Sequence, residues 1–86
     1  MKITGILIED KIKDKIISRH NVEADEIKQV IFTNPLVLKS KENRYLAIGH
    51  YQRYLTVIFE MHKNIAFIIT AYPSTEVQIK LHKKKK

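Results

Sequence analysis

Residues 43–60 read NRYLAIGHYQRYLTVIFE, and they carry the clearest signal of the fold class. It holds two runs rich in β-branched and aromatic residues, which favour strands, and only Tyr51 and Gln52 lie between them. A third run of the same kind follows a second short connection at Lys63 and Asn64. Short connections between such runs are typical of hairpins. The second half of the chain therefore predicts an antiparallel meander of three long strands, Arg44–His50, Arg53–Met61 and Ile65–Tyr72.

The first half of the chain begins with a predicted strand and a predicted helix. Lys2–Ile8 is rich in β-branched residues, as strands are. From Asp10 the spacing of apolar residues becomes helical, since three isoleucines fall on one face. We expect this helix to end near Arg19-His20, with Asn21 in the left-handed conformation that often follows a helix. A basic side chain is favourable at a helix end, which accounts for His20 there.

A second helix is predicted directly after the first. Glu23 stands at its N-cap, and apolar residues on both sides can form a hydrophobic staple. The helix ends before Pro35, because the residue preceding a proline avoids the helical conformation. Leu36–Lys39 then forms a short strand. The sequence thus predicts one α+β domain over residues 1–79, in which an N-terminal strand and two helices pack on an antiparallel sheet.

The hairpin register predicts a cluster of polar side chains at one edge of the sheet. If two residues connect each pair of strands, His50 lies opposite Arg53, with Tyr72 one strand away on the same face. Arg44 falls at the far end of that face. A change of one residue in either connection would exchange the faces. Gly49 lies inside a predicted strand, which indicates a bulge or a close backbone approach.

The formal net charge of +7 is concentrated at the C-terminus. Five of the sixteen Lys and Arg residues are Lys80 and Lys83–Lys86, which leaves eleven in residues 1–79 against nine Asp and Glu in the chain. Residues 80–86 therefore form a basic tail. It is either a disordered, solubilising appendage or an arm that seeks phosphate.

The composition also limits the classes of protein. The absence of cysteine excludes a disulfide framework and a thiolate metal site. The apolar run at the N-terminus meets Glu9 and Asp10, so it is far shorter than a signal peptide core or a membrane span. These acidic residues are explained by the start of a helix, and no metal site or cofactor is expected. We expect a cytoplasmic protein that does not associate with a membrane.

Several side chains of the predicted sheet suit the cleavage of RNA. Metal-free cleavage needs a base for the 2′-hydroxyl, cations for the charge on the phosphate, and an acid for the departing 5′-oxygen. Arginine suits the second task, histidine or tyrosine the others, and aromatic faces stack unpaired bases. Each candidate also has a structural explanation, as a strand-end charge, a hairpin residue or a core aromatic. The candidates are Arg44, His50, Arg53, His62 and Tyr72 for catalysis, and Tyr45, Tyr54, Lys80, Lys83 and Lys84 for RNA binding.

Five short motifs follow one another along the sequence in a characteristic order. They are His20-Asn21-Val22, Asn34-Pro35, Arg44-Tyr45-Leu46-Ala47-Ile48-Gly49, Gln52-Arg53-Tyr54-Leu55 and Ile69-Thr70-Ala71. In this order and spacing, over residues 6–75, the chain resembles the BrnT family of toxins from type II toxin–antitoxin systems, within the RelE-like superfamily. That family has a His-Gly-Val-like step between two helices, an Asn/Asp-Pro stop, an Arg-aromatic-x-x-Ile-Gly strand, a Gly-Arg-Leu-like strand entry and a closing Ile-Ser/Thr-Ala strand.

The resemblance implies a RelE-like fold and a function. The expected protein is a metal-independent, mRNA interferase-like endoribonuclease that cleaves RNA and inhibits translation. Its expected partners are the RNA substrate and a cognate antitoxin protein, which neutralises the toxin and through which operator DNA is bound.

The sequence departs from the family at two strand ends. Many members carry an arginine after the middle strand and another after the last, where this chain has Glu60-Met61-His62 and Ala71-Tyr72-Pro73. His62 and Tyr72 are candidates to act there as acid or base. The alternative is a non-catalytic module of the same fold that binds nucleic acid or protein.

Overall fold

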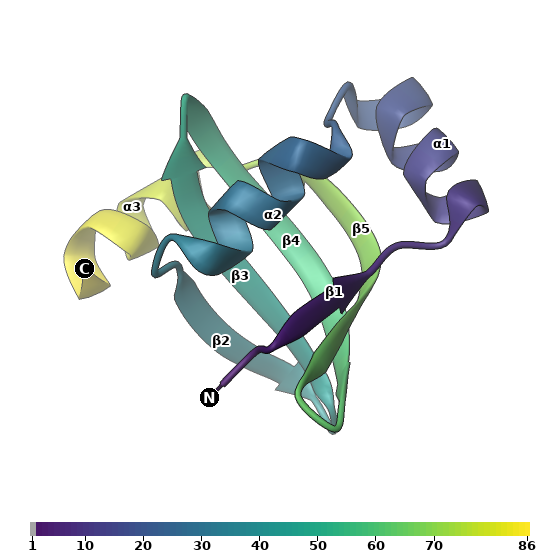
Figure 1. The fold of residues 1–86 in the computed structure, drawn as a ribbon. Coiled ribbons are helices and arrows are strands. Elements are labelled where there is room, and N and C mark those ends of the chain that lie inside the picture. The colour runs from purple at the N-terminus through teal and green to yellow at the C-terminus, as the bar shows by residue number, and fades with distance from the viewer. Residues whose placement is uncertain (1) are drawn as a thin grey trace.

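The computed structural model describes residues 2–86, which form five strands and three helices (Figure 1). The two predicted helices and the three long strands have nearly the predicted bounds, whereas the first strand is shorter and a third helix follows the sheet. Within residues 2–86, no helix has the length and apolar character needed to cross a membrane. In chain order the elements are β1 (Gly5–Leu7), α1 (Asp10–His20), α2 (Ala24–Phe32), β2 (Leu36–Lys41), β3 (Arg44–Tyr51), β4 (Arg53–His62), β5 (Ile65–Pro73) and α3 (Glu76–Lys85).

The five strands form one mixed sheet in the order β1-β5-β4-β3-β2. Strands β3 to β5 make the predicted antiparallel meander of three long strands, and β2 extends it as an antiparallel neighbour of β3. Strand β1, however, runs parallel to β5, where it pairs with Ile65–Phe67. The predicted α+β class is confirmed, and the N-terminal strand joins the antiparallel sheet as a parallel edge strand. A parallel pair needs a long crossover, which the chain from α1 to β4 supplies.

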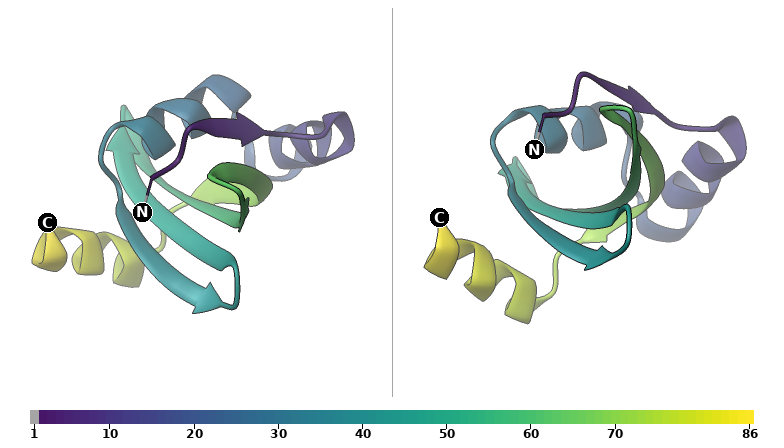
Figure 2. Two further views of the ribbon diagram at one scale, coloured as in Figure 1. Left: turned by 60° about the horizontal axis from the view of Figure 1, so that its bottom comes forward. Right: turned by 90° about the horizontal axis from the view of Figure 1, so that it is seen from below.

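Helix α2 lies in the hollow of the curved sheet (Figure 2). We call the side of the sheet that it covers the α2 face. A side chain on Gly49 there would place its Cβ 3.0 Å from Val30 Cγ1, so the glycine allows α2 to approach β3 closely, as predicted. The buried residues of the α2 face are Ala47, Gly49, Leu55, Val57, Phe59, Ala66, Ile68 and Ala71, and those packed on them include Ile16, Val22, Ile27, Val30 and Ile31.

The turn between β3 and β4 is one residue shorter than predicted. Gln52 alone separates the strands, with a φ of 65°. His50 therefore pairs with Tyr54, and the predicted pairing with Arg53 is wrong. The shift exchanges the two faces of β3 relative to β4. It also brings Gly49 beneath α2, where a larger side chain would collide with the helix.

A bulge changes the register between β4 and β5. From the turn at Lys63 and Asn64 as far as the pair Phe59–Ile68, the pairing follows the prediction. Beyond that pair it shifts by one residue, because Ile69 is an extra residue in β5. Beyond the bulge Tyr72 pairs with Thr56, on the face away from α2. The predicted placement of Tyr72 on one face with Arg53 is therefore wrong.

Helix α3 packs on the side of the sheet away from α2, which we call the α3 face (Figure 2). Ile48 and Thr56 are fully buried on this face. Thr75 and Gln78 form a capping box that starts the helix. Because α3 continues to Lys85, most of the predicted basic tail is helical, and its interpretation as a disordered appendage is wrong.

Candidate functional site

A network of hydrogen bonds joins the start of α3 to the ends of β4 and β5. The buried Thr56 hydroxyl donates to Gln78 Oε1 at 2.9 Å and lies 2.8 Å from Ser74 Oγ. Gln78 Nε2 in turn donates to the Tyr72 hydroxyl at 2.9 Å. The side chain of Gln78 thus holds the predicted catalytic tyrosine in place.

The hydroxyl proton of Tyr72 takes no part in its hydrogen bond with Gln78. Its oxygen accepts a hydrogen bond from Gln78, so its own proton remains available to another acceptor. The His20 ring lies close by, with 6.0 Å between the two ring centroids and a tilt of 52°. His20 is half-buried at the last residue of α1. The fold therefore brings an imidazole from α1 beside a phenol from β5.

A row of aromatic rings lies next to this network on the α3 face. The rings of His50 and Tyr54 meet edge to face with centroids 4.7 Å apart, and those of Tyr54 and His82 do so at 5.3 Å. Within residues 2–86, the buried Nδ1 of His82 has no hydrogen-bond partner. His50 is exposed. The strand register places His50 and Tyr54 on the same face as Tyr72, although the structure shows no contact between His50 and Tyr72.

Arg53 does not join this cluster. It lies on the α2 face, where its Nη2 donates to Glu26 Oε2 at 2.8 Å and to the carbonyl oxygen of Asn21 at 2.6 Å. The predicted cluster of His50, Arg53 and Tyr72 is therefore wrong, because Arg53 lies on the opposite face of the sheet from the other two. The one-residue shift of the β3–β4 hairpin separates Arg53 from His50, and the bulge at Ile69 separates it from Tyr72.

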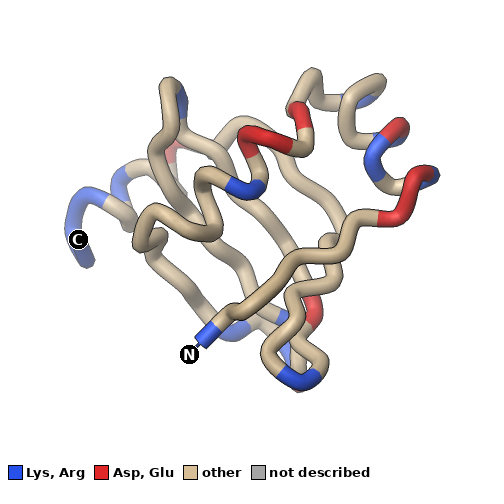
Figure 3. Tube along the Cα trace, in the orientation of Figure 1, with Lys and Arg blue, Asp and Glu red and all other residues tan. Residues whose placement is uncertain are grey.

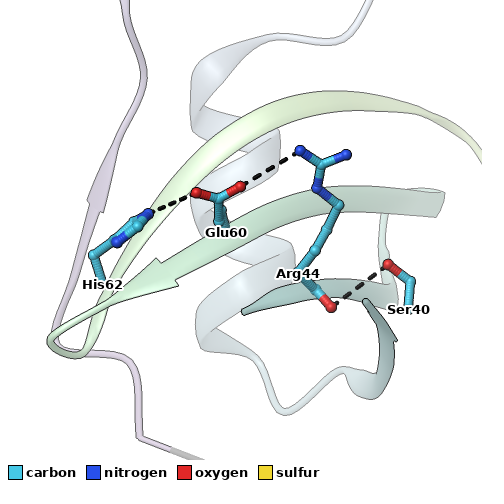
Figure 4. A network of polar contacts seen from close by, with 4 residues as sticks. All are labelled: Ser40, Arg44, Glu60 and His62. Carbon is cyan, nitrogen blue, oxygen red and sulfur yellow. Dashed lines mark hydrogen bonds and ion pairs between the residues drawn. The ribbon is translucent and has the colours of Figure 1, made fainter. Parts of the chain in front are cut away.

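Arg44 and His62 meet at a carboxylate that the sequence did not single out. Arg44 Nη2 lies 3.4 Å from Glu60 Oε2, and His62 Nε2 lies 2.7 Å from Glu60 Oε1 (Figure 4). The hydrogen bond from His62 and the neighbouring Arg44 guanidinium lower the pKa of Glu60. Glu60 lies four residues along β4 from Thr56, about 13 Å at the usual rise of a strand. Arg44 and His62 are thus remote from Tyr72.

The predicted RNA-binding residues lie in three places, of which one is the aromatic row that contains Tyr54. Tyr45 stacks on Phe59 with ring centroids 5.8 Å apart and belongs to the α2-face core, so its ring is engaged in packing. The lysines of α3 are exposed and form the most basic segment of the trace (Figure 3). The exposed lysines of α3 that sequence analysis selected are Lys80, Lys83 and Lys84.

Sequence reasoning missed three residues of the network and assigned a fourth to a helix end. Thr56, Ser74 and Gln78 are too common in strands, turns and caps to suggest a site. The pattern Thr75-x-x-Gln78 did contain a capping-box signal, but nothing in it indicated a bond to Tyr72. His20 was read as a helix-end residue, and that placement is correct.

Comparisons with known proteins support the fold. No protein-family model matches the sequence, and no curated protein is similar to it. The structure is similar to that of BrnT, a ribonuclease toxin of Brucella abortus, with a TM-score of 0.69 and 19% sequence identity. The match covers 84% of this chain and 97% of the BrnT chain. The expected resemblance to BrnT is therefore confirmed for the fold.

Proposed function

We propose that this protein is an endoribonuclease toxin of the BrnT type. The observation that carries the proposal is the pairing of His20 with Tyr72, whose oxygen is held by Gln78 so that its proton is free. The fold it shares with a ribonuclease toxin supports the same conclusion.

The two rings supply the acid and the base of RNA cleavage. The imidazole of His20 removes the proton of the 2′-hydroxyl, and the 2′-oxygen attacks the adjacent phosphorus. The bond from phosphorus to the 5′-oxygen breaks as Tyr72 donates its proton to that oxygen. The products are a 2′,3′-cyclic phosphate and a free 5′-hydroxyl. Because side chains carry out both proton transfers, we expect cleavage without a divalent metal ion.

The other predicted catalytic residues are paired with carboxylates or lie farther from the proposed acid and base. Arg53 and Arg44 are engaged by Glu26 and Glu60, and His62 lies with Arg44 at the far end of β4. His50 remains near the site through its contact with Tyr54, and the exposed α3 lysines can attract the RNA backbone.

As a toxin, the protein would inhibit translation by cutting RNA in the cytoplasm. A cognate antitoxin protein would neutralise it, and operator DNA would be bound only through the complex of the two. Co-expression with the protein encoded by the adjacent gene tests this part of the proposal, since an antitoxin should restore growth and co-purify with the toxin.

The test of the chemistry is RNA cleavage in the presence of a chelator. We expect Tyr72→Phe and His20→Ala each to slow cleavage by about 100-fold or more. Tyr45→Phe is the matched control, because it removes the hydroxyl of a tyrosine on the α2 face and should cleave as the unaltered protein does. Equal activity in Tyr72→Phe and Tyr45→Phe would contradict the proposed acid.

A second candidate function is RNA binding without cleavage, which the basic helix α3 favours. In that case RNA would bind with a steep dependence on salt, and replacing Lys80, Lys83 and Lys84 by glutamine would flatten it. The RNA would stay full length on a denaturing gel.

A further inference from the structure

A pocket of about 340 Å³ lies between α1 and β5, beside the proposed catalytic pair. Strand β1 pairs only with Ile65–Phe67, so it leaves the later part of β5 without a neighbouring strand on that side, and α1 packs there. The bulge at Ile69 lies at this same place. The lining of the pocket includes Ile12, Lys15, Arg19, His20, Ile69 and Thr70.

The pocket is cationic. Lys15 and Arg19 are four residues apart and therefore lie on one side of α1, next to His20. No acidic residue is among those that line the pocket. None of the ion pairs within residues 2–86 involves Lys15 or Arg19. Both side chains are thus available to an anion.

The C-terminal end of a helix repels an anion, but the positive charges of Lys15 and Arg19 outweigh this repulsion. The C-terminus of α1 carries the equivalent of about half a negative charge, against two full positive charges on Lys15 and Arg19. The Asn21 N–H also donates to the Ile17 carbonyl oxygen at 2.9 Å, which satisfies one of the exposed helix-end groups.

We propose that this pocket binds a nucleotide through its phosphate group. Lys15 and Arg19 hold the phosphate oxygens, Thr70 offers a hydroxyl, and the side chains of Ile12 and Ile69 contact the sugar and base. Arg19 and Lys15 of α1 would then supply the positive charges that this chain lacks at the ends of β4 and β5. The role of the pocket in cleavage rests on the proposed function, whereas nucleotide binding can be measured without it.

The experiment is a titration of the full chain with adenosine 3′-monophosphate, followed by the amide NMR signals of Thr70 and His20. Inorganic phosphate serves as the comparison. We expect both signals to shift, and the nucleotide to bind more tightly than phosphate because the isoleucines contact its sugar and base. Equal affinities would overturn the assignment to a nucleotide.

Two variants and one control test the residues. Lys15→Gln and Arg19→Gln should each weaken nucleotide binding by about tenfold, as expected for a lost hydrogen bond to a charged group. Lys13→Gln changes the charge on another side of the same helix, outside the pocket, and should bind as the unaltered chain does. Equal binding by all three variants overturns the pocket assignment, even if the protein cleaves RNA. Selective weakening supports it, even if RNA is not cleaved, in which case only the proposed function fails.

Discussion

Arg53 Nη2 lies 2.8 Å from Glu26 Oε2 and so joins the first residue of β4 to helix α2. The same nitrogen donates to the carbonyl oxygen of Asn21, directly after α1. One side chain therefore connects three elements that are distant in sequence. This arrangement gives Arg53 a role in stability.

We expect Arg53→Ala to lower stability. The ion pair is partly exposed, with 37% and 20% of the two side chains accessible to solvent, so its contribution is modest. Together with the bond to Asn21, the loss should be about 1 kcal/mol in the free energy of unfolding. For a domain of this size that lowers Tm by roughly 4–8 °C in a thermal melt.

A double-mutant cycle with Glu26→Ala separates the pair from other effects of Arg53. A coupling energy of about 0.5 kcal/mol is expected for the ion pair. RNA cleavage measured well below Tm should change little. An unchanged melt combined with lost cleavage would return Arg53 to the catalytic site.

The misplacement of Arg53 shows where sequence reasoning failed. The elements follow from local patterns, and the turn at Lys63 and Asn64 was predicted from the strand-like runs on either side of it. Asn64, with a φ of 69°, is also of a residue type that readily adopts a positive φ. Gln52 carries no such signal, although its φ is 65°. A one-residue difference in this turn was enough to move Arg53 away from His50.

The candidate site was harder to predict than the fold. Tyr72 was selected from the sequence, but its partners depend on how separate elements pack. His20 approaches it only because α1 lies along β5, and Gln78 reaches it only because α3 folds back on the sheet. Neither contact leaves a periodic pattern or a motif in the sequence.

Gly49→Ala should destabilise the protein through a collision with α2. The new Cβ would lie 3.0 Å from Val30 Cγ1 and 3.4 Å from Pro35 Cβ. Valine is stiff at χ1, so it cannot turn away easily. The expected cost is about 1–3 kcal/mol, as for other overpacked cores, and a urea unfolding curve measures it.

Gly5→Ala is the matched control for this substitution. Its Cβ would also lie 3.0 Å from a neighbour, but that atom is Cδ1 of Ile65, the far end of a flexible side chain. We expect a smaller loss than at Gly49. An equal loss at both positions would show that the close approach of α2 to β3 is not the cause.

Glu60 should contribute to a loss of stability in acid. The hydrogen bond from His62, together with Arg44, lowers the pKa of Glu60 in the folded protein. The folded state therefore binds fewer protons at this group than the unfolded state, and stability rises with pH. The contribution is present above the unfolded pKa of about 4.3 and is lost as the pH falls through the lower folded pKa.

Thermal melts of Glu60→Gln between pH 7 and pH 3 measure this contribution. The variant should have a lower Tm than the unaltered chain at pH 7, and the difference should vanish towards pH 3. Glu42→Gln is the control, because Glu42 is exposed and takes part in none of the ion pairs of residues 2–86. A constant difference across the pH range would contradict the lowered pKa.

Gln78 offers a way to separate the position of Tyr72 from the stability of α3. Its Oε1 accepts from the Thr75 N–H and the Thr56 hydroxyl, whereas its Nε2 donates to Tyr72. Gln78→Ala removes all of these bonds, including the half of the capping box that the Gln78 side chain makes, while Thr75 Oγ1 still accepts from the backbone N–H of residue 78. The loss should cost about 1 kcal/mol and speed hydrogen exchange in α3.

Gln78→Glu keeps an oxygen that accepts the bonds from Thr75 and Thr56 and replaces the nitrogen that donates to Tyr72. The introduced carboxylate still accepts from Thr75 and Thr56, and its charge is favourable in the first turn of a helix. Tyr72, having lost the Nε2 donor, would instead give its proton to the carboxylate, so the proton would no longer be available to the leaving oxygen. We expect cleavage to fall by about tenfold or more while the melt and the exchange of α3 amides stay unchanged. Undiminished cleavage by Gln78→Glu would mean that Gln78 does not position the acid, and that α3 acts on the site only through stability.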